Sequence, residues 1–171
     1  MTGRSPWSGL VLTLMKSDRE YMQMALAEAR QAMAQGEVPV GAVLVDDGGG
    51  VVARAHNRRE GECDATAHAE ILAIRAGGKR LGHWRLADCT LYVTLEPCPM
   101  CAGALVMGRL RRLVYAVPDA RAGAVGSIFN VPDHPSLNHR LEVTAGVLED
   151  ECRTLLQQFF KHCRRIGADG S

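Results

Sequence analysis

Short apolar runs alternate along this chain with longer segments of helical periodicity, and this alternation limits the possible folds more than any other feature. Runs that are typical of β-strands lie at 38–45, 51–55, 90–95, 113–117 and 141–144. Patterns that are typical of amphipathic helices lie at 17–36, 67–76, 97–107 and 149–165. The predicted order is therefore α-β-β-α-β-α-β-β-α, which is typical of an α/β domain.

The connections between the strands predict how the strands pair. The segment 47–50 contains three consecutive glycines between the first two strands, so these strands are expected to form an antiparallel hairpin. The later strands are joined through helices and are expected to run parallel to one another. We therefore predict a mixed five-stranded sheet with helices on both faces, which is a three-layer α/β/α arrangement.

Capping residues indicate where the helices begin and end. Ser17 and Glu20 form the S-x-x-E pattern of a capping box, which predicts the start of the first helix. Gly36 is placed to end this helix, and Gly77-Gly78 is placed to end the second one. The segments 56–66 and 118–139 carry no helical or strand period and are predicted to be loops.

These signals set the expected domain boundaries. We predict one domain at 17–166, preceded by a disordered extension at 1–16 and followed by a short tail at 167–171. The apolar stretch 10–15 is too short for a secretory signal, and no small-residue cleavage site follows it. Translation that begins at Met15 is an alternative explanation of the extension.

The composition fits one soluble domain with a substantial core. The chain has 171 residues, of which 47% are hydrophobic. Its 20 Lys and Arg against 19 Asp and Glu give a net charge of +1, which excludes a histone-like arm or an acidic tail. No apolar run approaches the roughly 20 residues that a membrane-spanning helix needs, so we expect a cytoplasmic protein without a membrane partner.

The cysteine pattern points to metal binding rather than to disulfides. The six cysteines are Cys63, Cys89, Cys98, Cys101, Cys152 and Cys163. They are too sparse for a disulfide-rich secreted scaffold, and only Cys98 and Cys101 are clustered. Cys152 and Cys163 are eleven residues apart on the last helix, about three turns, and are predicted to be core residues.

The candidate chemistry lies in two segments, His68-Ala69-Glu70 and Pro97-Cys98-Pro99-Met100-Cys101. Cys98 and Cys101 are three residues apart, which places both sulfur atoms on one face of a helix start. One imidazole from His68 and two thiolates suit Zn²⁺ and leave its fourth tetrahedral position open for water. A carboxylate beside that position that does not bind the metal is a candidate proton shuttle, and we assign this role to Glu70.

Simpler explanations exist for each part of this pattern. An isolated C-x-x-C segment is also typical of a redox pair or of half a structural zinc site. His68 has the position of a helix cap, and a fourth ligand from Cys63 or Cys89 would close the site and make it structural. A structural zinc module has no need of Glu70, and this argues for catalysis.

The combined pattern H-x-E and P-C-x-x-C resembles the signature of the zinc nucleobase deaminases. The segments 37–43, 66–71 and 94–104 resemble those of bacterial tRNA-specific adenosine deaminases over about 21–160. This resemblance implies the cytidine deaminase-like fold, one zinc ion per subunit and a homodimer. It also implies conversion of adenosine to inosine at the wobble position of tRNA, with an arginine tRNA bearing the ACG anticodon as the expected substrate.

The resemblance implies further roles for residues near the substrate. Asn57 matches a position that hydrogen-bonds the base, Asp119 matches a loop acid near the sugar, and Phe159 and Phe160 match aromatic residues of the nucleotide cleft. The alternatives are turn capping for Asn57 and Asp119, and core packing for the two phenylalanines. The chain departs from the family at three recognition-loop positions, which are Arg59, Ala65 and Pro118.

The substrate class has rivals that share the same zinc signature. A deaminase of free guanine, cytosine, a nucleoside or a pterin-like precursor is the main alternative within the enzymes. RNA binding needs only a local basic patch, and six residues are candidates for it, although a solvated charged face is the alternative. These candidates are Arg109, Arg111, Arg112, Lys161, Arg164 and Arg165.

Overall fold

The computed structural model describes residues 15–169, with side chains through residue 166. The expected extension therefore lies outside the described residues, apart from 15 and 16. The helices are α1 (Asp18–Ala34), α2 (Arg59–Glu62), α3 (Ala69–Leu81), α4 (Pro99–Met107) and α5 (Glu149–Asp169), with a 3₁₀ turn at Val131–Asp133. The strands are β1 (Gly41–Val45), β2 (Val51–His56), β3 (Thr90–Leu95), β4 (Arg112–Val117) and β5 (Glu142–Ala145).

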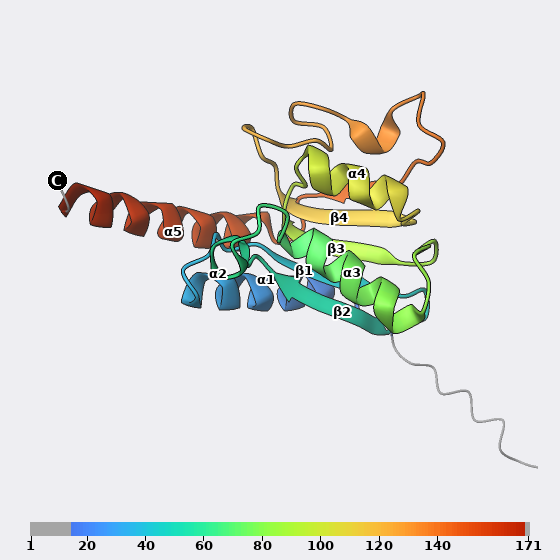
Figure 1. Ribbon diagram of the computed structural model, residues 1–171, viewed down its shortest axis with the longest axis horizontal. Coiled ribbons are helices and arrows are strands. Elements are labelled where there is room, and N and C mark those ends of the chain that lie inside the picture. The colour runs from blue at the N-terminus through green and yellow to red at the C-terminus, as the bar shows by residue number, and fades with distance from the viewer. Residues whose placement is uncertain (1–14, 170–171) are drawn as a thin grey trace, which may run out of the picture.

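The five strands form one mixed sheet in the order β2-β1-β3-β4-β5. β1 is antiparallel to both β2 and β3, whereas β3, β4 and β5 run parallel to one another. Helices α3 and α4 cover one face of the sheet, and α1 and α5 lie on the other (Figure 1). The predicted three-layer α/β/α architecture is confirmed.

The sheet separates two apolar cores. One lies under α3 and α4 and includes Leu44, Leu91 and Leu105, all of which are fully buried. The other lies under α1 and α5 and includes Met22 and Val114. Because β1, β3 and β4 are buried on both faces, they read in the sequence as nearly continuous apolar runs.

The prediction that Gly77-Gly78 ends the second helix is wrong. Helix α3 continues to Leu81 and ends at Gly82, which has the left-handed conformation with φ of 76°. A Cβ atom on Gly77 would come within 2.3 Å of the Leu44 side chain. The glycine at this position therefore allows the helix to lie close against the sheet.

Two further sequence predictions need correction. The expected loop 56–66 contains the short helix α2, and the buried carboxylate of Glu37 accepts a hydrogen bond of 2.8 Å from the backbone N–H of Gly61 in that helix. Cys152 is buried as expected, but Cys163 is exposed. Helix α5 extends past the sheet in Figure 1, so its second half has no strand to pack against.

A capping box holds the start of the N-terminal helix, and an ion pair attaches this helix to the sheet. Ser17 and Glu20 make both predicted capping bonds. Asp18 pairs with Arg112 through two hydrogen bonds of 2.7 and 2.9 Å and accepts another from the hydroxyl of Tyr92. Arg112 is therefore engaged in an ion pair that stabilises the fold. It is not available to bind a phosphate, although the sequence suggested it for a basic RNA-binding patch.

Among residues 15–169, every helix is too short or too polar to cross a lipid bilayer.

Candidate functional site

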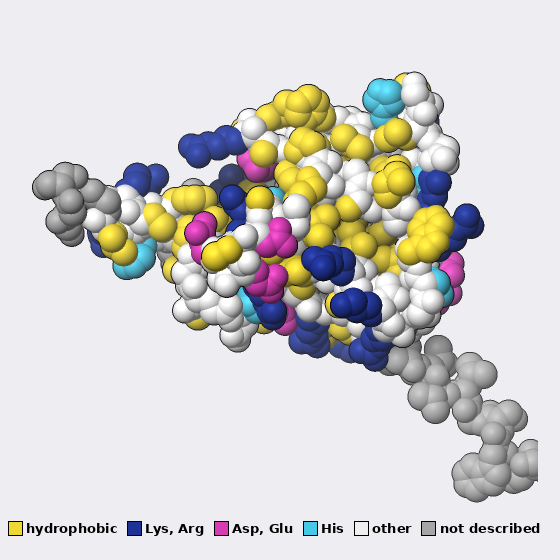
Figure 2. Space-filling view, viewed as in Figure 1, with side chains coloured by type: hydrophobic (Ala, Val, Ile, Leu, Met, Phe, Trp, Pro, Cys, Tyr) yellow, Lys and Arg dark blue, Asp and Glu magenta, His cyan; other side chains and the backbone are white. Residues whose placement is uncertain are grey.

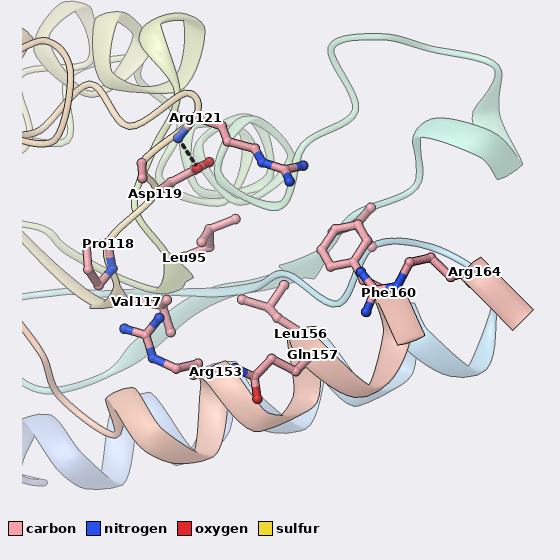
Figure 3. A pocket seen from close by; sticks show the side chains of 12 residues that line it. Leu95, Val117, Pro118, Asp119, Arg121, Arg153, Leu156, Gln157, Phe160 and Arg164 are labelled. Atoms are coloured by element: carbon pink, nitrogen blue, oxygen red, sulfur yellow. Dashed lines mark hydrogen bonds between the residues drawn. The ribbon is translucent and has the colours of Figure 1, made fainter. Parts of the chain in front are cut away.

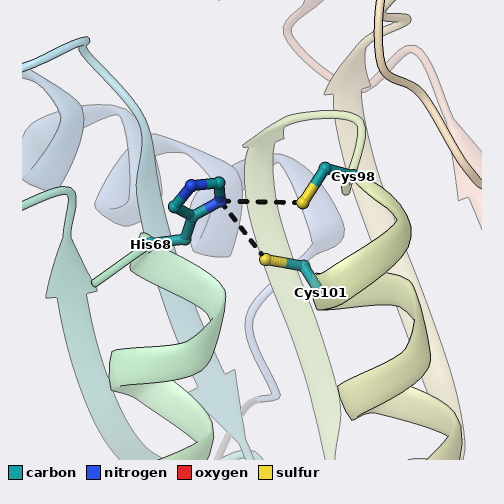
Figure 4. A group of neighbouring side chains, drawn as sticks. All are labelled: His68, Cys98 and Cys101. Carbon is teal, nitrogen blue, oxygen red and sulfur yellow. Dashed lines mark hydrogen bonds between the residues drawn. The ribbon is translucent and has the colours of Figure 1, made fainter. Parts of the chain in front are cut away.

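The three predicted metal ligands meet where the first turns of α3 and α4 approach each other beside β3 (Figure 4). His68 is the N-cap residue of α3, Cys98 is that of α4, and Cys101 follows in the first turn of α4. The Nδ1 atom of His68 lies 3.7 Å from the sulfur of Cys98 and 3.5 Å from that of Cys101. All three candidate ligand atoms lie within 4.8 Å of one another.

These distances fit a tetrahedral zinc ion. Bond lengths of about 2.0 Å to nitrogen and about 2.3 Å to sulfur place such ligand atoms about 3.6 Å apart at the tetrahedral angle. One imidazole and two sulfurs are also the donors that zinc prefers. Neither Cys63 nor Cys89 belongs to the group, so the cluster offers three protein ligands and not the four of a closed structural site.

Contacts within the cluster shift the pKa values of its members in opposite directions. Hydrogen bonds from Cys101 and His68 lower the pKa of the Cys98 thiol to about 4. The contact with Cys98 and burial raise the pKa of Cys101, and the contact with Cys98 also raises that of His68. A divalent cation would replace these protons, because thiolates and neutral imidazole are the forms that bind metal.

Glu70 lies beside the cluster without being part of it. It is the second residue of α3, and its side chain is 4% exposed. Burial raises the pKa of Glu70 to about 7. A carboxyl group with this pKa exchanges a proton readily near neutral pH, as a general acid and base must.

Asn57 supports the start of α3. It is buried, and its Oδ1 accepts a 3.0 Å hydrogen bond from the backbone N–H of Ala69. This bond caps the helix that His68 itself does not cap with its side chain. Asn57 therefore acts as a cap, which is the role that the sequence left open as the alternative to hydrogen-bonding the base. Within residues 15–169, its amide nitrogen donates no hydrogen bond to protein.

Glu96, for which the sequence alone indicates no role, holds the loop that carries Asp119. Its buried carboxylate accepts hydrogen bonds from the backbone N–H groups of Asp119, Val125 and Ser127, at 2.8, 3.0 and 3.0 Å, and from the hydroxyl of Ser127. Burial alone would raise the pKa of Glu96, but these hydrogen bonds bring it below its ordinary value. The loop is thus fixed to the residue two positions before Cys98.

The close approach of the loop to the Glu96 carboxylate requires a glycine at position 123. A Cβ atom at Gly123 would lie 2.4 Å from the carboxyl carbon of Glu96. The neighbouring Ala124 donates a 2.9 Å backbone hydrogen bond to Pro97, so the loop also follows the segment that leads into α4. A charged residue directly after a buried strand was the signal in the sequence that could have identified Glu96.

Asp119 lines a pocket of about 450 Å³ between the strand ends and α5 (Figure 3). Its Oδ1 accepts hydrogen bonds from the backbone N–H groups of Arg121 and Ala122, at 2.9 and 3.3 Å, so it also caps its own turn. Phe160 lines the pocket, whereas Phe159 is half-buried and packs edge-to-face on Phe160 with ring centres 5.4 Å apart. Of the two aromatic residues that the resemblance implied for the cleft, Phe160 lines this pocket and Phe159 does not.

The six candidate RNA-binding residues do not form one patch. Arg164 lines the pocket beside Asp119, and Lys161 and Arg165 are exposed on the same helix. Arg109 and Arg111 line a different pocket, near the start of β4.

Comparison with known proteins agrees with this geometry. Residues 15–117 match the family described as the cytidine and deoxycytidylate deaminase zinc-binding region. The tRNA-specific adenosine deaminase of Bacillus subtilis (strain 168) is 49% identical over 151 residues, which cover 88% of this chain and 93% of the relative. The chain belongs to the tRNA-specific adenosine deaminases. It is therefore a member of a family of zinc-dependent hydrolases.

Solved structures show the same fold. One from a study of A-to-I editing by tRNA:A34 deaminases at the wobble position has a TM-score of 0.77 and 46% identity, covering 80% of this chain and 98% of its own. The guanine deaminase of Nitrosomonas europaea has a TM-score of 0.70 and 26% identity, covering 84% of each chain. The cytidine deaminase-like fold is thus confirmed, and the guanine deaminase is the more distant of the two.

Proposed function

We propose that this protein hydrolyses the exocyclic amine of adenosine at the wobble position of a tRNA anticodon and produces inosine and ammonia. The observation that carries the proposal is the zinc-type cluster with Glu70 buried beside it. The substrate is supported by the 49% identity to a tRNA-specific adenosine deaminase. An arginine tRNA with an ACG anticodon is the first substrate to test.

His68, Cys98 and Cys101 would hold the zinc ion. When bound, zinc acts as a Lewis acid that makes a water molecule nucleophilic near neutral pH. Glu70 takes the proton from the attacking water and gives it to the ring nitrogen next to the reacting carbon. Glu70 then takes the proton of the new hydroxyl group on that carbon and transfers it to the amine, so that the C–N bond breaks, a carbonyl forms and ammonia leaves. Glu70 is suited to both transfers because it adjoins the cluster without being a ligand.

Other residues would hold the nucleotide. The amide nitrogen of Asn57 has no protein acceptor among the described residues, and its position next to α3 suits a hydrogen bond to the base. Asp119 and Phe160 line the pocket next to the strand ends and would contact the ribose and a neighbouring base. We retain Phe159 as a substrate-binding candidate through its packing against Phe160.

An anticodon loop suits the buried position of Glu70 beside the metal cluster. The reacting base must leave its stack to reach the cluster, and an unpaired loop nucleotide does so at lower free-energy cost than a paired one. We propose the cytoplasm as the location of the reaction, because tRNA is the proposed substrate.

We also propose that two copies pair through the outer face of α3, α4 and the loop that follows β4. Large apolar side chains are exposed on this face, including Trp84, Met107, Ile128 and Phe129, which are 59%, 69%, 47% and 54% exposed. Figure 2 shows hydrophobic side chains gathered over α3 and α4. A two-fold pair would cover the same face of both copies. Light scattering should give a dimer, and Met107→Glu should give a monomer with intact helix content.

The choice between tRNA and a free base is tested by product release. Zinc-loaded protein is incubated with an arginine tRNA transcript, guanine, cytosine or adenosine, and ammonia is measured. We expect ammonia from the tRNA alone. Ammonia from guanine but not from tRNA would contradict the proposed substrate and would favour the activity of the distant structural relative.

A further inference from the structure

We propose that a second, arginine-rich pocket binds backbone phosphates of the tRNA outside the anticodon loop; this proposal rests on the proposed function. The arginine pocket, of about 570 Å³, lies where the α3–β3 loop, the α4–β4 turn and the segment before β5 meet. Its charged lining residues and its histidine are Arg85, Arg109, Arg111, His139, Arg140 and Glu142.

The arginine pocket lies far from the metal cluster. It surrounds the amino end of β4, which begins at Arg112, whereas the cluster follows the carboxyl end of β3, which is parallel to β4. A six-residue strand is about 20 Å long. The two sites are therefore separated by about the length of one strand. One stem-loop of RNA is long enough to contact both.

The positive charge of the pocket is largely uncompensated. Four arginines face one carboxylate, that of Glu142. Arg140 pairs with Asp133 at 3.3 Å, but in the part of the chain that the structure describes none of the other three forms an ion pair. Guanidinium groups bind phosphate oxygens with two parallel N–H donors, so free arginines in one concave site favour a phosphate ligand.

The pocket is also held in shape. Arg109 has the left-handed conformation with φ of 60°, which is uncommon for a residue with a side chain. Its guanidinium donates a hydrogen bond to Oδ1 of Asn138, and Nε2 of His139 donates one of 2.6 Å to the carbonyl of Leu110. The segment that carries Arg140 is therefore fixed to the α4–β4 turn, which brings these arginines together.

The lining favours the RNA backbone over a free nucleotide. The apolar lining consists of Ala87 and Leu141, which offer no aromatic surface for a base. The guanidinium of Arg85 lies over one face of the nearby ring of Trp84, 4.9 Å from the ring centre. Contacts of this kind position a nucleic acid by its phosphates without reading its sequence. The base-paired stem next to an anticodon loop presents such phosphates.

The test removes two of the free charges. Arg85→Gln with Arg111→Gln changes two exposed side chains that form no ion pair in the described structure, so the fold should be retained. The slope of log affinity for whole tRNA against log salt concentration should fall by about two. KM for whole tRNA should rise about tenfold, whereas kcat and zinc content should not change. An RNA reduced to the anticodon loop and its closing pairs should react as it does with the unaltered protein.

A matched control removes the same charge elsewhere. Arg30→Gln with Arg54→Gln changes two exposed arginines, one on α1 and one on β2, the edge strand opposite β5. This variant should retain the salt slope and the KM of the unaltered protein.

Three outcomes would overturn the proposal. The first is an unchanged salt slope in the pocket variant, and the second is an equal loss on the loop-only RNA. The third is inorganic phosphate that binds the pocket at fixed ionic strength without competing with tRNA, which would assign the pocket to a small anion. Unaltered protein that binds tRNA through these arginines but forms no inosine would support the pocket and contradict only the proposed function.

Discussion

At the carboxyl end of β3 the ionisable groups are buried or half-buried and His68 is hydrogen-bonded to both cysteines, whereas at the amino end of β4 Arg85 and Arg111 are exposed and form no ion pair in the part of the chain that the structure describes. Burying charged groups without compensation is unfavourable by several kcal/mol, so the first arrangement persists only because contacts and metal binding compensate for it. Exposed arginines carry little such penalty and attract phosphates over a distance set by salt. The metal cluster with Glu70 is therefore suited to catalysis, whereas the arginine pocket is suited to binding phosphates.

The largest expected effect comes from removing a metal ligand. Cys98→Ser replaces a soft thiolate with a hydroxyl that binds zinc poorly, so zinc and deamination should be lost together. Metal content by mass spectrometry and inosine formation on tRNA measure both. Cys63→Ser is the control, because Cys63 is exposed and lies outside the cluster. A fully metallated, active Cys98 variant would refute the ligand assignment.

The next effect separates metal binding from proton transfer. Glu70→Gln keeps the size of the side chain and removes its ability to exchange a proton, so turnover should fall about 10³-fold with zinc content unchanged. Glu60→Gln, on the exposed helix α2, should leave both quantities unchanged. Normal turnover in the Glu70 variant would exclude Glu70 from the mechanism.

A smaller effect is expected from the residue that positions the Asp119 loop. Glu96→Gln leaves one acceptor oxygen where the carboxylate now accepts four hydrogen bonds. The loop should shift, and kcat/KM on tRNA should fall about tenfold at constant zinc content. Asp46→Asn, which alters a carboxylate that accepts a bond from Gly50 in the β1–β2 turn, is the control. Equal losses in both variants would contradict a positioning role.

The smallest effect concerns the stability of the fold, to which the pair of Asp18 and Arg112 at the amino end of β4 contributes. The hydrogen bond with Arg112 and that with Tyr92 hold the pKa of Asp18 below its ordinary value of 3.8. The folded state therefore gains stability from Asp18 above pH 3.8, and this gain disappears as the pH falls through the lowered pKa. Because the pair is partly exposed, Asp18→Asn should reduce the free energy of unfolding by about 1 kcal/mol at pH 7 and leave kcat unchanged.

Urea unfolding of both proteins at pH 7 and at pH 3 measures this difference. A difference that grows as the pH falls would contradict the assigned direction of the pKa shift.

The sequence predicted the features that depend on short-range spacing. The C-x-x-C segment and the capping box are local patterns, and the structure brings Cys98 and Cys101 together with His68 as expected. The role of Glu96 depends on a loop that returns from 23 to 31 residues later in the chain, so its position directly after a buried strand marks the residue but does not indicate what its carboxylate binds. Gly77 was misread because a glycine that allows close packing looks the same in sequence as one that ends a helix.

The exposed position of Cys163 was missed for a similar reason. Periodicity indicates which face of a helix is apolar, but it does not indicate where the sheet beneath that helix ends. Helix α5 extends beyond the sheet, so the same periodicity leads to burial at Cys152 and to exposure at Cys163 (Figure 1). The choice between Phe159 and Phe160 at the pocket likewise depends on the rotation of α5 relative to the strands.

The proposed function requires that the metal cluster and Glu70 together deaminate one adenosine in an anticodon. The most direct measurement maps inosine, by sequencing of reverse transcripts, along an arginine tRNA transcript with an ACG anticodon after reaction with zinc-loaded protein. We expect inosine at the wobble position alone, and about 10³-fold slower formation there with Glu70→Gln. Inosine at other adenosines of the loop, or an unmodified wobble position, would contradict the proposed function.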